Sequence, residues 1–122
     1  MTFKSKQKKF VIHKHTKAGD THWDFMLEKD GVFATWRLEF PPEELPQSCK
    51  AEKIFDHDIR FLTYEGPVNK GKGTAKIAEK GVFEIIRNEE NEMQIKLSGT
   101  ILKGVFTLTN AGENIWHLIR QQ

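Results

Sequence analysis

Residues 10–38, FVIHKHTKAGDTHWDFMLEKDGVFATWRL, decide the fold that we predict for this chain. Their pattern predicts three adjacent strands at about residues 10–15, 21–29 and 32–38. The dipeptide Asp30-Gly31 separates the last two strands, and Asp-Gly is a strong signal for a two-residue hairpin turn. The resulting register pairs Lys29 with Val32, Phe25 with Trp36, and Asp24 with Arg37.

Residues 21–28 place two different kinds of side chain on the two faces of their strand, because successive side chains point to opposite faces. One face is apolar and predicts the core: Trp23, Phe25 and Leu27. The opposite face predicts a site: His22, Asp24 and Met26.

The preceding strand brings more imidazoles to this second face. His13 and His15 share one face, and the loop that follows lets the strand turn back, so His15 is expected to meet His22 and Asp24. Two imidazoles and one carboxylate suit a divalent ion such as Mn²⁺ or Zn²⁺, whereas a single carboxylate argues against a Ca²⁺ cage. The alternative is a group of polar residues on an exposed face. His13 is either a partner of a ligating imidazole or a solvent-exposed residue.

The rest of the chain predicts short strands separated by turns, with no amphipathic run long enough for a major helix. Further strands are expected at 61–64, 75–79, 82–87, 92–97, 100–102, 105–109 and 115–120, with Lys80-Gly81 as a turn. Residues 51–55 fit either a strand or a helical turn, and the prolines of 41–46 predict a surface crossover. Because closure removes exposed strand edges, we expect an all-β, mainly antiparallel fold: a small closed or nearly closed β-barrel with short helical turns in its connections.

A chain of 122 residues is long enough for one hydrophobic core. We expect a single domain over residues 10–122 after a basic tail at 1–9. Lysines gather near the candidate site: Lys4, Lys6, Lys8, Lys9, Lys14 and Lys17. Because the net charge is only +2, a solvated tail explains them as well as a nucleic-acid contact does.

The composition also narrows the cellular setting. The longest apolar runs, such as residues 82–86, are too short to cross a bilayer, and no apolar signal segment precedes Phe10. The single cysteine, Cys49, cannot form an internal disulfide, which agrees with a reducing compartment. We therefore expect a cytoplasmic protein with no membrane partner, and we expect a monomer.

Two segments of the chain resemble a known family. HKHTKAGDTHWDFMLEKDGV (residues 13–32) and DHDIRFLTYEG (residues 56–66) resemble the 3′-phosphoesterase domain of bacterial and archaeal DNA ligase D. The specific part is a histidine that ends one strand, then histidine, aromatic, aspartate and phenylalanine on the next, then a histidine before an aromatic-acidic-glycine turn. WDFMLE, TWRL and YEGPV look closer to stand-alone relatives of that domain.

The resemblance implies a β-barrel phosphoesterase that uses Mn²⁺ to heal 3′ ends of DNA or RNA in repair, by removing a 3′-phosphate or a terminal ribonucleotide. The metal ligands of the family fall on His15, His22 and Asp24, and its phosphate-contacting histidine falls on His57. It also implies nucleic-acid 3′ ends, with a separate ligase or repair polymerase, as partners.

The sequence departs from the family pattern at four points. The loop between His15 and His22 is one residue longer than in the ligase form. The family's arginine two residues past the aspartate is Met26, and its tyrosine four past the last histidine is Phe61. A basic residue upstream falls near Cys49, with Lys50 as the closest substitute. Arg37 and Arg60 are the cations best able to take over phosphate binding.

Several roles stay open on the sequence alone. His57 is a general acid, a cationic phosphate contact, or a loop residue with neither role. Arg37 either clamps phosphate or pairs with Asp24 or Glu39. Lysines in the turn at 69–73 either follow a nucleic-acid backbone or serve the turn. The functions that fit are a metal-dependent 3′-phosphoesterase, a non-catalytic module that binds nucleic-acid ends, and a phosphoesterase acting on a small phosphorylated metabolite.

Overall fold

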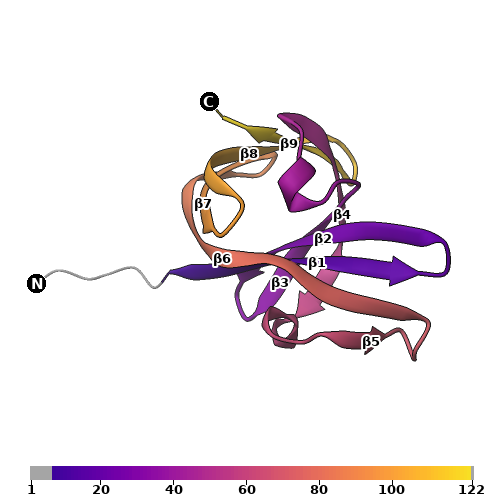
Figure 1. The fold of residues 1–122 in the computed structure, drawn as a ribbon. Helices are drawn as coiled ribbons and strands as arrows, with labels where there is room; N and C mark the ends of the chain where they lie inside the picture. Colours follow the sequence, from indigo (N-terminus) through magenta and orange to yellow (C-terminus); the bar gives the residue numbers. More distant parts are fainter. Residues whose placement is uncertain (1–6, 122) are drawn as a thin grey trace, which may run out of the picture.

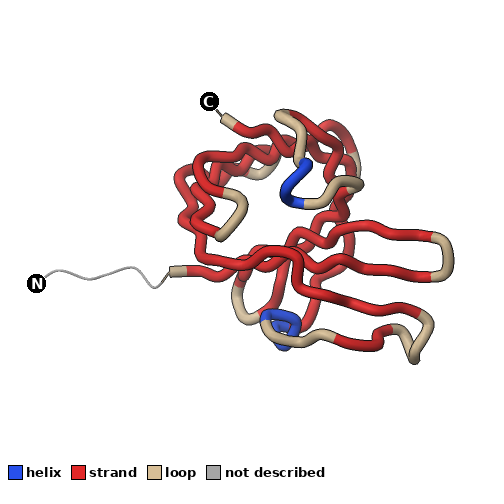
Figure 2. The backbone as a smooth tube through the Cα atoms, in the orientation of Figure 1, coloured by secondary structure: helices blue, strands red, loops and turns tan. Residues whose placement is uncertain are grey.

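The structure, a computed structural model, describes residues 7–121, so Lys4 and Lys6 of the basic tail lie outside the described residues. Within that range the chain forms β1 (Lys8–Lys17), β2 (Asp20–Lys29), β3 (Val32–Leu38), β4 (Ser48–Asp58), β5 (Gly66–Val68), β6 (Gly73–Glu89), β7 (Glu92–Gly99), β8 (Lys103–Gly112) and β9 (Ile115–Arg120). Two short 3₁₀ helices, η1 (Pro42–Glu44) and η2 (Ile59–Leu62), lie in the connections (Figure 2). No helix within residues 7–121 is long and apolar enough to cross a membrane.

The strands pair in the order β1-β2-β3-β4-β9-β8-β7-β6-β5, and β1 also pairs with β6. All of these pairings are antiparallel. The added pairing closes every strand except β5 into a ring, and β5 pairs as a short branch with the start of β6, on the edge that β7 does not reach (Figure 1). The expected all-β, mainly antiparallel and closed architecture is confirmed, although the branch and the long β6 make it less regular than a simple barrel.

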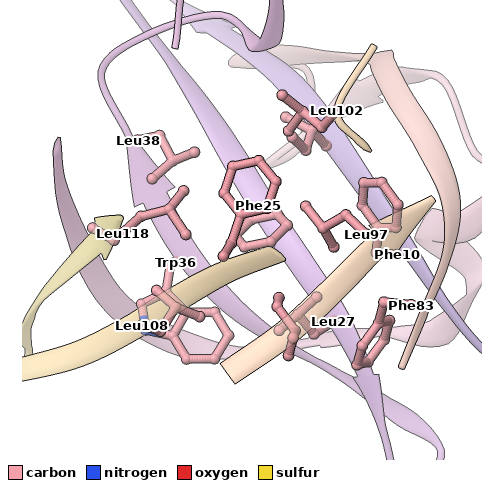
Figure 3. Close-up of a cluster of buried hydrophobic side chains, with 14 of the residues drawn as sticks. Phe10, Phe25, Leu27, Trp36, Leu38, Phe83, Leu97, Leu102, Leu108 and Leu118 are labelled. Atoms are coloured by element: carbon pink, nitrogen blue, oxygen red, sulfur yellow. The ribbon is translucent and has the colours of Figure 1, made fainter. Parts of the chain in front are cut away.

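The interior of the ring is filled by apolar side chains from its strands (Figure 3). Phe10, Phe25, Phe106 and Ile95 are each 0% exposed. Leu45, which follows η1, belongs to the same cluster, so this connection helps to cover the ring. Burial of side chains of this size contributes about 1.5–3 kcal/mol each, and the cluster is therefore the main source of stability.

The hairpin between β2 and β3 has the expected register. Asp30 and Gly31 have φ angles of 49° and 84°, the left-handed values that a tight hairpin turn requires. As predicted, Lys29 pairs with Val32, Phe25 with Trp36, and Asp24 with Arg37. The predicted division of β2 into two faces is also confirmed, because Phe25 and Leu27 belong to the interior cluster, whereas Asp24 does not and Met26 belongs to a second, smaller apolar cluster.

The predicted turn at Lys80-Gly81 is wrong, because β6 runs through it as one strand. The strand stays extended since it pairs with β1 as far as Phe83 and with β7 from Gly81 onward. A Cβ at Gly81 would collide with the carbonyl oxygen of Ser98. This glycine therefore serves the close approach of two strands and not a turn.

The predicted strand at 100–102 is a turn held by a buried carboxylate. Glu79 is 3% exposed, and its oxygens accept hydrogen bonds from the backbone N–H groups of Thr100, Ile101 and Leu102 at 3.1, 2.6 and 2.6 Å. Those groups are thus satisfied by a side chain and not by a strand ladder.

The predicted strand at 61–64 is also wrong, because η2 covers its first half and the second half belongs to no strand. Asp58 precedes this helix, and its side chain accepts a hydrogen bond from the N–H of Arg60 at 2.8 Å. This is the N-cap arrangement that favours a helical turn. The ambiguous segment before it is resolved as β4, which ends at Asp58.

Candidate metal and phosphate site

A cavity of about 450 Å³ lies against the outer face of β1 and β2, opposite the interior cluster. Residues of η2, β5 and the turn after β5 form its other wall, and Figure 1 shows β5 and this short helix beside β1–β3. All six residues singled out from the sequence line this one cavity: His15, His22, Asp24, Arg37, His57 and Arg60. The fold therefore brings together side chains from β1, β2, β3, β4 and η2.

The three candidate ligands are neighbours. His15 and His22 are paired across β1 and β2, and the centroids of their rings lie 4.6 Å apart. The Nε2 atom of His22 lies 3.4 Å from Oδ1 of Asp24. The predicted meeting of these side chains across the ladder is confirmed as geometry.

Several polar atoms of this group are buried without a hydrogen-bond partner. They are Nδ1 of His15, Nδ1 of His22 and Oδ1 of Asp24. Buried polar atoms normally have a partner, and two imidazole nitrogens with one carboxylate oxygen suit Mn²⁺ or Zn²⁺. The donor types fit such an ion, although within residues 7–121 no three His, Cys, Asp or Glu side chains form a ready-made metal-binding group.

Burial favours the neutral form of the two histidines of β1. Burial lowers the pKa of His15 below 6.5, and the neighbouring His22 lowers it further. Burial also lowers the pKa of His13. Neutral imidazole is the form that binds metal ions.

The expectation that His13 is solvent-exposed is wrong, because it is 2% exposed. Its ring packs edge-on against Phe61 of η2, with the centroids 5.7 Å apart. His13 is paired with Asp24 across β1 and β2, so it lies directly beside the candidate ligands.

His57 is oriented by its own strand. Its Nδ1 lies 3.0 Å from the carbonyl oxygen of Phe55, and a carbonyl only accepts, so Nδ1 carries the hydrogen. The other nitrogen, Nε2, lies 3.9 Å from Oδ2 of Asp24 and faces the cavity.

The charges that line the cavity are mostly positive. Arg37, Arg60 and Lys70 contribute cations, and Asp24 is the one carboxylate among the described residues that line it. The buried Nε of Arg37 has no hydrogen-bond partner, and no carboxylate within residues 7–121 forms an ion pair with this guanidinium. The reading in which Arg37 merely pairs with Asp24 or Glu39 is therefore wrong for this conformation.

The departures from the family pattern fall in two places. Met26 and Phe61 line the cavity, so an apolar side chain stands where the family has an arginine or a tyrosine. Cys49 instead belongs to the interior cluster, where burial raises its pKa to about 11. Lys50 forms an ion pair with Glu39 at 3.3 Å and is absent from the described lining of the cavity.

Three of the cavity residues that the sequence analysis did not single out contact other side chains or backbone groups of the site. Asn69, with a φ of 54°, places its Nδ2 3.4 Å from Nε2 of His15. Tyr64 donates a hydrogen bond to the carbonyl oxygen of Pro67 and packs edge-on against Phe61. Phe55 lies at the cavity with its ring against His57. Only the Asn-Lys-Gly composition of the turn at 69–71 signalled one of them, since such residues tolerate positive φ.

Comparisons with known proteins identify the family of this chain. Residues 12–110 match the family described as the DNA Ligase D 3′-phosphoesterase domain. The chain is 27% identical over 126 residues to the multifunctional non-homologous end joining protein LigD of Mycobacterium bovis, and it is 25% identical over 119 residues to the LigD protein of Pseudomonas aeruginosa.

These alignments cover nearly all of the chain but a small part of each relative. They span 93% of this chain and 16% of the mycobacterial protein, and 92% of this chain and 13% of the Pseudomonas protein. The similarity thus concerns one domain of larger multifunctional proteins. Because the family match covers most of its length, the chain belongs to the DNA ligase D 3′-phosphoesterase domain family.

Proposed function

We propose that this domain is a divalent-metal-dependent phosphoesterase that removes a 3′-phosphate or a terminal ribonucleotide from DNA or RNA ends. The observation that carries the proposal is the combination of Arg37, Arg60 and Lys70 with an imidazole-carboxylate group around one cavity. A phosphate ester is the substrate class that needs both a cationic surround and a metal. The family's description as a 3′-phosphoesterase domain supports the same reaction.

His15, His22 and Asp24 are the proposed metal ligands, and Mn²⁺ is the proposed ion, with Zn²⁺ as the second choice. When bound, such an ion neutralises a phosphate oxygen and lowers the pKa of a bound water. Asn69 contacts His15 from the turn after β5, and Asp20 lies 3.6 Å from Nδ1 of His22. A carboxylate beside the second ring nitrogen, such as Asp20 beside Nδ1 of His22, can accept its N–H and hold a ligating imidazole in one orientation.

Arg37 is the proposed phosphate clamp. Its guanidinium reaches the cavity from β3, and its buried Nε has no partner within the described residues. A planar guanidinium donates two parallel hydrogen bonds to a phosphate. Arg60 and Lys70 add positive charge at the cavity, which stabilises the charge on the transferring phosphoryl group.

His57 is the proposed contact to the reacting phosphate oxygens. Because Nδ1 donates to the Phe55 carbonyl, Nε2 is an acceptor in the neutral ring and a donor in the imidazolium. The imidazolium form therefore donates to a phosphate oxygen or protonates the leaving oxygen. The backbone contact holds the ring in the orientation that either role needs.

A 3′-hydroxyl end is the product that a ligase or a polymerase can use. We therefore propose a separate ligase or repair polymerase as the downstream partner of this domain. The LigD relatives are named for non-homologous end joining, which agrees with a role at broken ends.

Met26 and Phe61 favour one alternative function. They replace two polar groups of the family pattern at the cavity, so the remaining cations would bind a nucleic-acid end without efficient turnover. The alternative is a non-catalytic module that recognises such ends.

The deciding experiment measures phosphate release from a 3′-phosphorylated single-stranded DNA, its RNA counterpart and a 3′-phosphorylated mononucleotide, with Mn²⁺, Zn²⁺ or EDTA. We expect Mn²⁺-stimulated release from the oligonucleotides that is lost in Asp24→Ala and His57→Ala. Binding without release in any metal would instead support the end-binding module. Equal turnover of the mononucleotide would support a small-metabolite phosphoesterase.

A further inference from the structure

Phe55 is the most exposed of the large hydrophobic side chains in the described part of the chain. It is 75% exposed, although it belongs to β4 and lines the site cavity. An isolated exposed apolar residue is ordinary. The position of this one, at the edge of a cationic cavity, is not explained by packing.

A bulge in β4 aims Phe55 at the cavity. Phe33 of β3 pairs with His57, and Thr35 pairs with Ile54, so Ala34 faces two residues of β4. The extra residue breaks the alternation of side chains, and Ile54, Phe55 and His57 all line the cavity as a result. Bulges beside functional sites commonly re-aim a side chain in this way.

The Phe55 ring is already ordered by the site. It lies parallel to the imidazole of His57, with an interplanar angle of 5° and centroids 4.8 Å apart. His57 in turn packs edge-on against Phe61 at 5.8 Å. Within residues 7–121, Phe55 stacks on no further aromatic ring, so a flat π face extends the site outward from His57.

We propose that Phe55 is a stacking platform for an unpaired nucleobase of the terminal dinucleotide of the substrate strand. The inference rests on the proposed nucleic-acid substrate and adds a residue that determines which ends are accepted. Every base offers a π face, and proteins that bind single strands combine such aromatic platforms with positive charge. Arg60 and Lys70 supply that charge at the same cavity.

A nucleobase fits Phe55 better than a protein partner does. A stable protein interface buries about 800 Å² on each side, and the other large exposed apolar residues of the described chain lie outside the cavity lining: Phe40, Ile59, Ile85, Ile86 and Ile101. The exposed ring of Phe55 offers a surface for stacking but little further apolar area for a protein interface. It therefore suits a nucleobase better than a protein.

The test is a double-mutant cycle between Phe55 and the bases of the strand. Affinity for a single-stranded DNA oligonucleotide with a 3′-hydroxyl is measured by fluorescence anisotropy in Mn²⁺. This strand carries neither a 3′-phosphate nor a terminal ribonucleotide, so no turnover occurs. The same strand is prepared with an abasic residue at the last or the second-last position. Phe55→Ala, Phe55→Leu and Phe55→Trp are compared with Phe40→Ala, a partly exposed phenylalanine outside the cavity lining.

We expect Phe55→Ala and Phe55→Leu to weaken binding of the intact strand roughly 5- to 150-fold, because a stacked base contributes about 1–3 kcal/mol. The affinities of Phe55→Trp and Phe40→Ala for the intact strand should stay within about twofold of the affinity of the wild-type protein. On the strand that lacks the stacked base, Phe55→Ala should have almost no further effect.

The inference is overturned if the unchanged protein does not bind the strand, if Phe55→Ala binds normally, or if its loss is equal on intact and abasic strands. Phosphate release from the 3′-phosphorylated strand, measured in parallel, separates this inference from the proposed function. If binding depends on Phe55 but no phosphate is released, the enzymatic function is refuted and the stacking role of Phe55 stands. If Phe55→Ala releases phosphate normally and binds the strand with unchanged affinity, the stacking role of Phe55 is refuted and the enzymatic function stands.

Discussion

His15 and His22 occupy directly opposed positions on β1 and β2, and their ring centroids lie 4.6 Å apart. Neither Nδ1 atom has a hydrogen-bond partner within the described chain. Two imidazoles at this separation bring no charge of their own while they are neutral, so Asp24 supplies the only negative charge among the three candidate ligands. Cation binding should therefore depend most strongly on this carboxylate.

Asp24→Ala should weaken Mn²⁺ binding by at least about 100-fold, since loss of even an outer contact to a ligand costs 10- to 100-fold. Isothermal titration calorimetry with Mn²⁺ measures the effect. His117→Gln, a change at an exposed histidine of β9, is the matched control and should bind normally. Unchanged Mn²⁺ affinity in Asp24→Ala would contradict the proposed ligand set.

Arg37→Ala should lower kcat/KM for a 3′-phosphorylated oligonucleotide by roughly 10- to 100-fold, because hydrogen bonds to a charged group contribute about 1.5–3 kcal/mol. Arg37→Lys should recover little of this, because lysine cannot donate two parallel hydrogen bonds in the geometry of a guanidinium. Steady-state kinetics give the values. Arg87→Ala, which removes a guanidinium paired with Glu92 on the β6–β7 hairpin, should leave kcat/KM unchanged. Full rescue by lysine would argue for a simple point charge at Arg37.

Glu79→Ala should lower the free energy of unfolding by about 3 kcal/mol, because buried backbone donors would lose their acceptor. The carboxylate accepts from Lys80, Thr100, Ile101 and Leu102. Urea denaturation measures the loss. Glu84→Ala on the exposed face of the same strand should change the stability by less than about 0.5 kcal/mol. Similar values for the two variants would show that the carboxylate does not hold the turn.

Cys49 should react very slowly with iodoacetamide at pH 8, because burial raises the pKa of its thiol from 9.0 to about 11 and the thiolate is the reactive form. The same shift has a consequence for stability. Between pH 9 and pH 11 the unfolded chain loses this proton and the folded chain keeps it, so the shift makes stability fall as pH rises through that window. Mass spectrometry of the alkylated protein and urea denaturation of Cys49→Ala beside the unchanged protein test both statements. Rapid alkylation of the folded protein at pH 8 would contradict the burial.

Local rules predicted the part of the fold that carries the site. The Asp30-Gly31 turn fixes the pairing of β2 and β3, and strict alternation then separates Phe25 from Asp24. Both signals act over a few residues, so neither needs knowledge of the rest of the chain. The closed ring followed from the number of short strands and from the cost of exposed edges.

The features that were missed depend on contacts between distant segments. In the sequence, Gly81 looks like a turn residue. The close approach of the Ser98 backbone is what explains a glycine at this position. Glu79 looks like an ordinary surface residue of a strand, yet its acceptor atoms meet residues more than twenty positions away. The orientation of Phe55 depends on a bulge against β3, which no local pattern announces.

The wall made by β1 and β2 is a single sheet layer, so adjacent residues in one strand serve separate purposes. Its inner side packs into the interior cluster, and its outer side carries the candidate site beside a second small apolar cluster of Val11, Met26 and Phe33. Point changes at the polar residues of the outer side can alter the chemistry of this domain without repacking its interior. Insertions and deletions act differently, since a shift by one residue would exchange the two sides over the whole strand. Length variation is therefore tolerable only where the ladder ends, at the turn of residues 18–19 that joins the two strands. This turn lies between His15 and His22, the connection in which the resemblance to the ligase-fused form implies one additional residue.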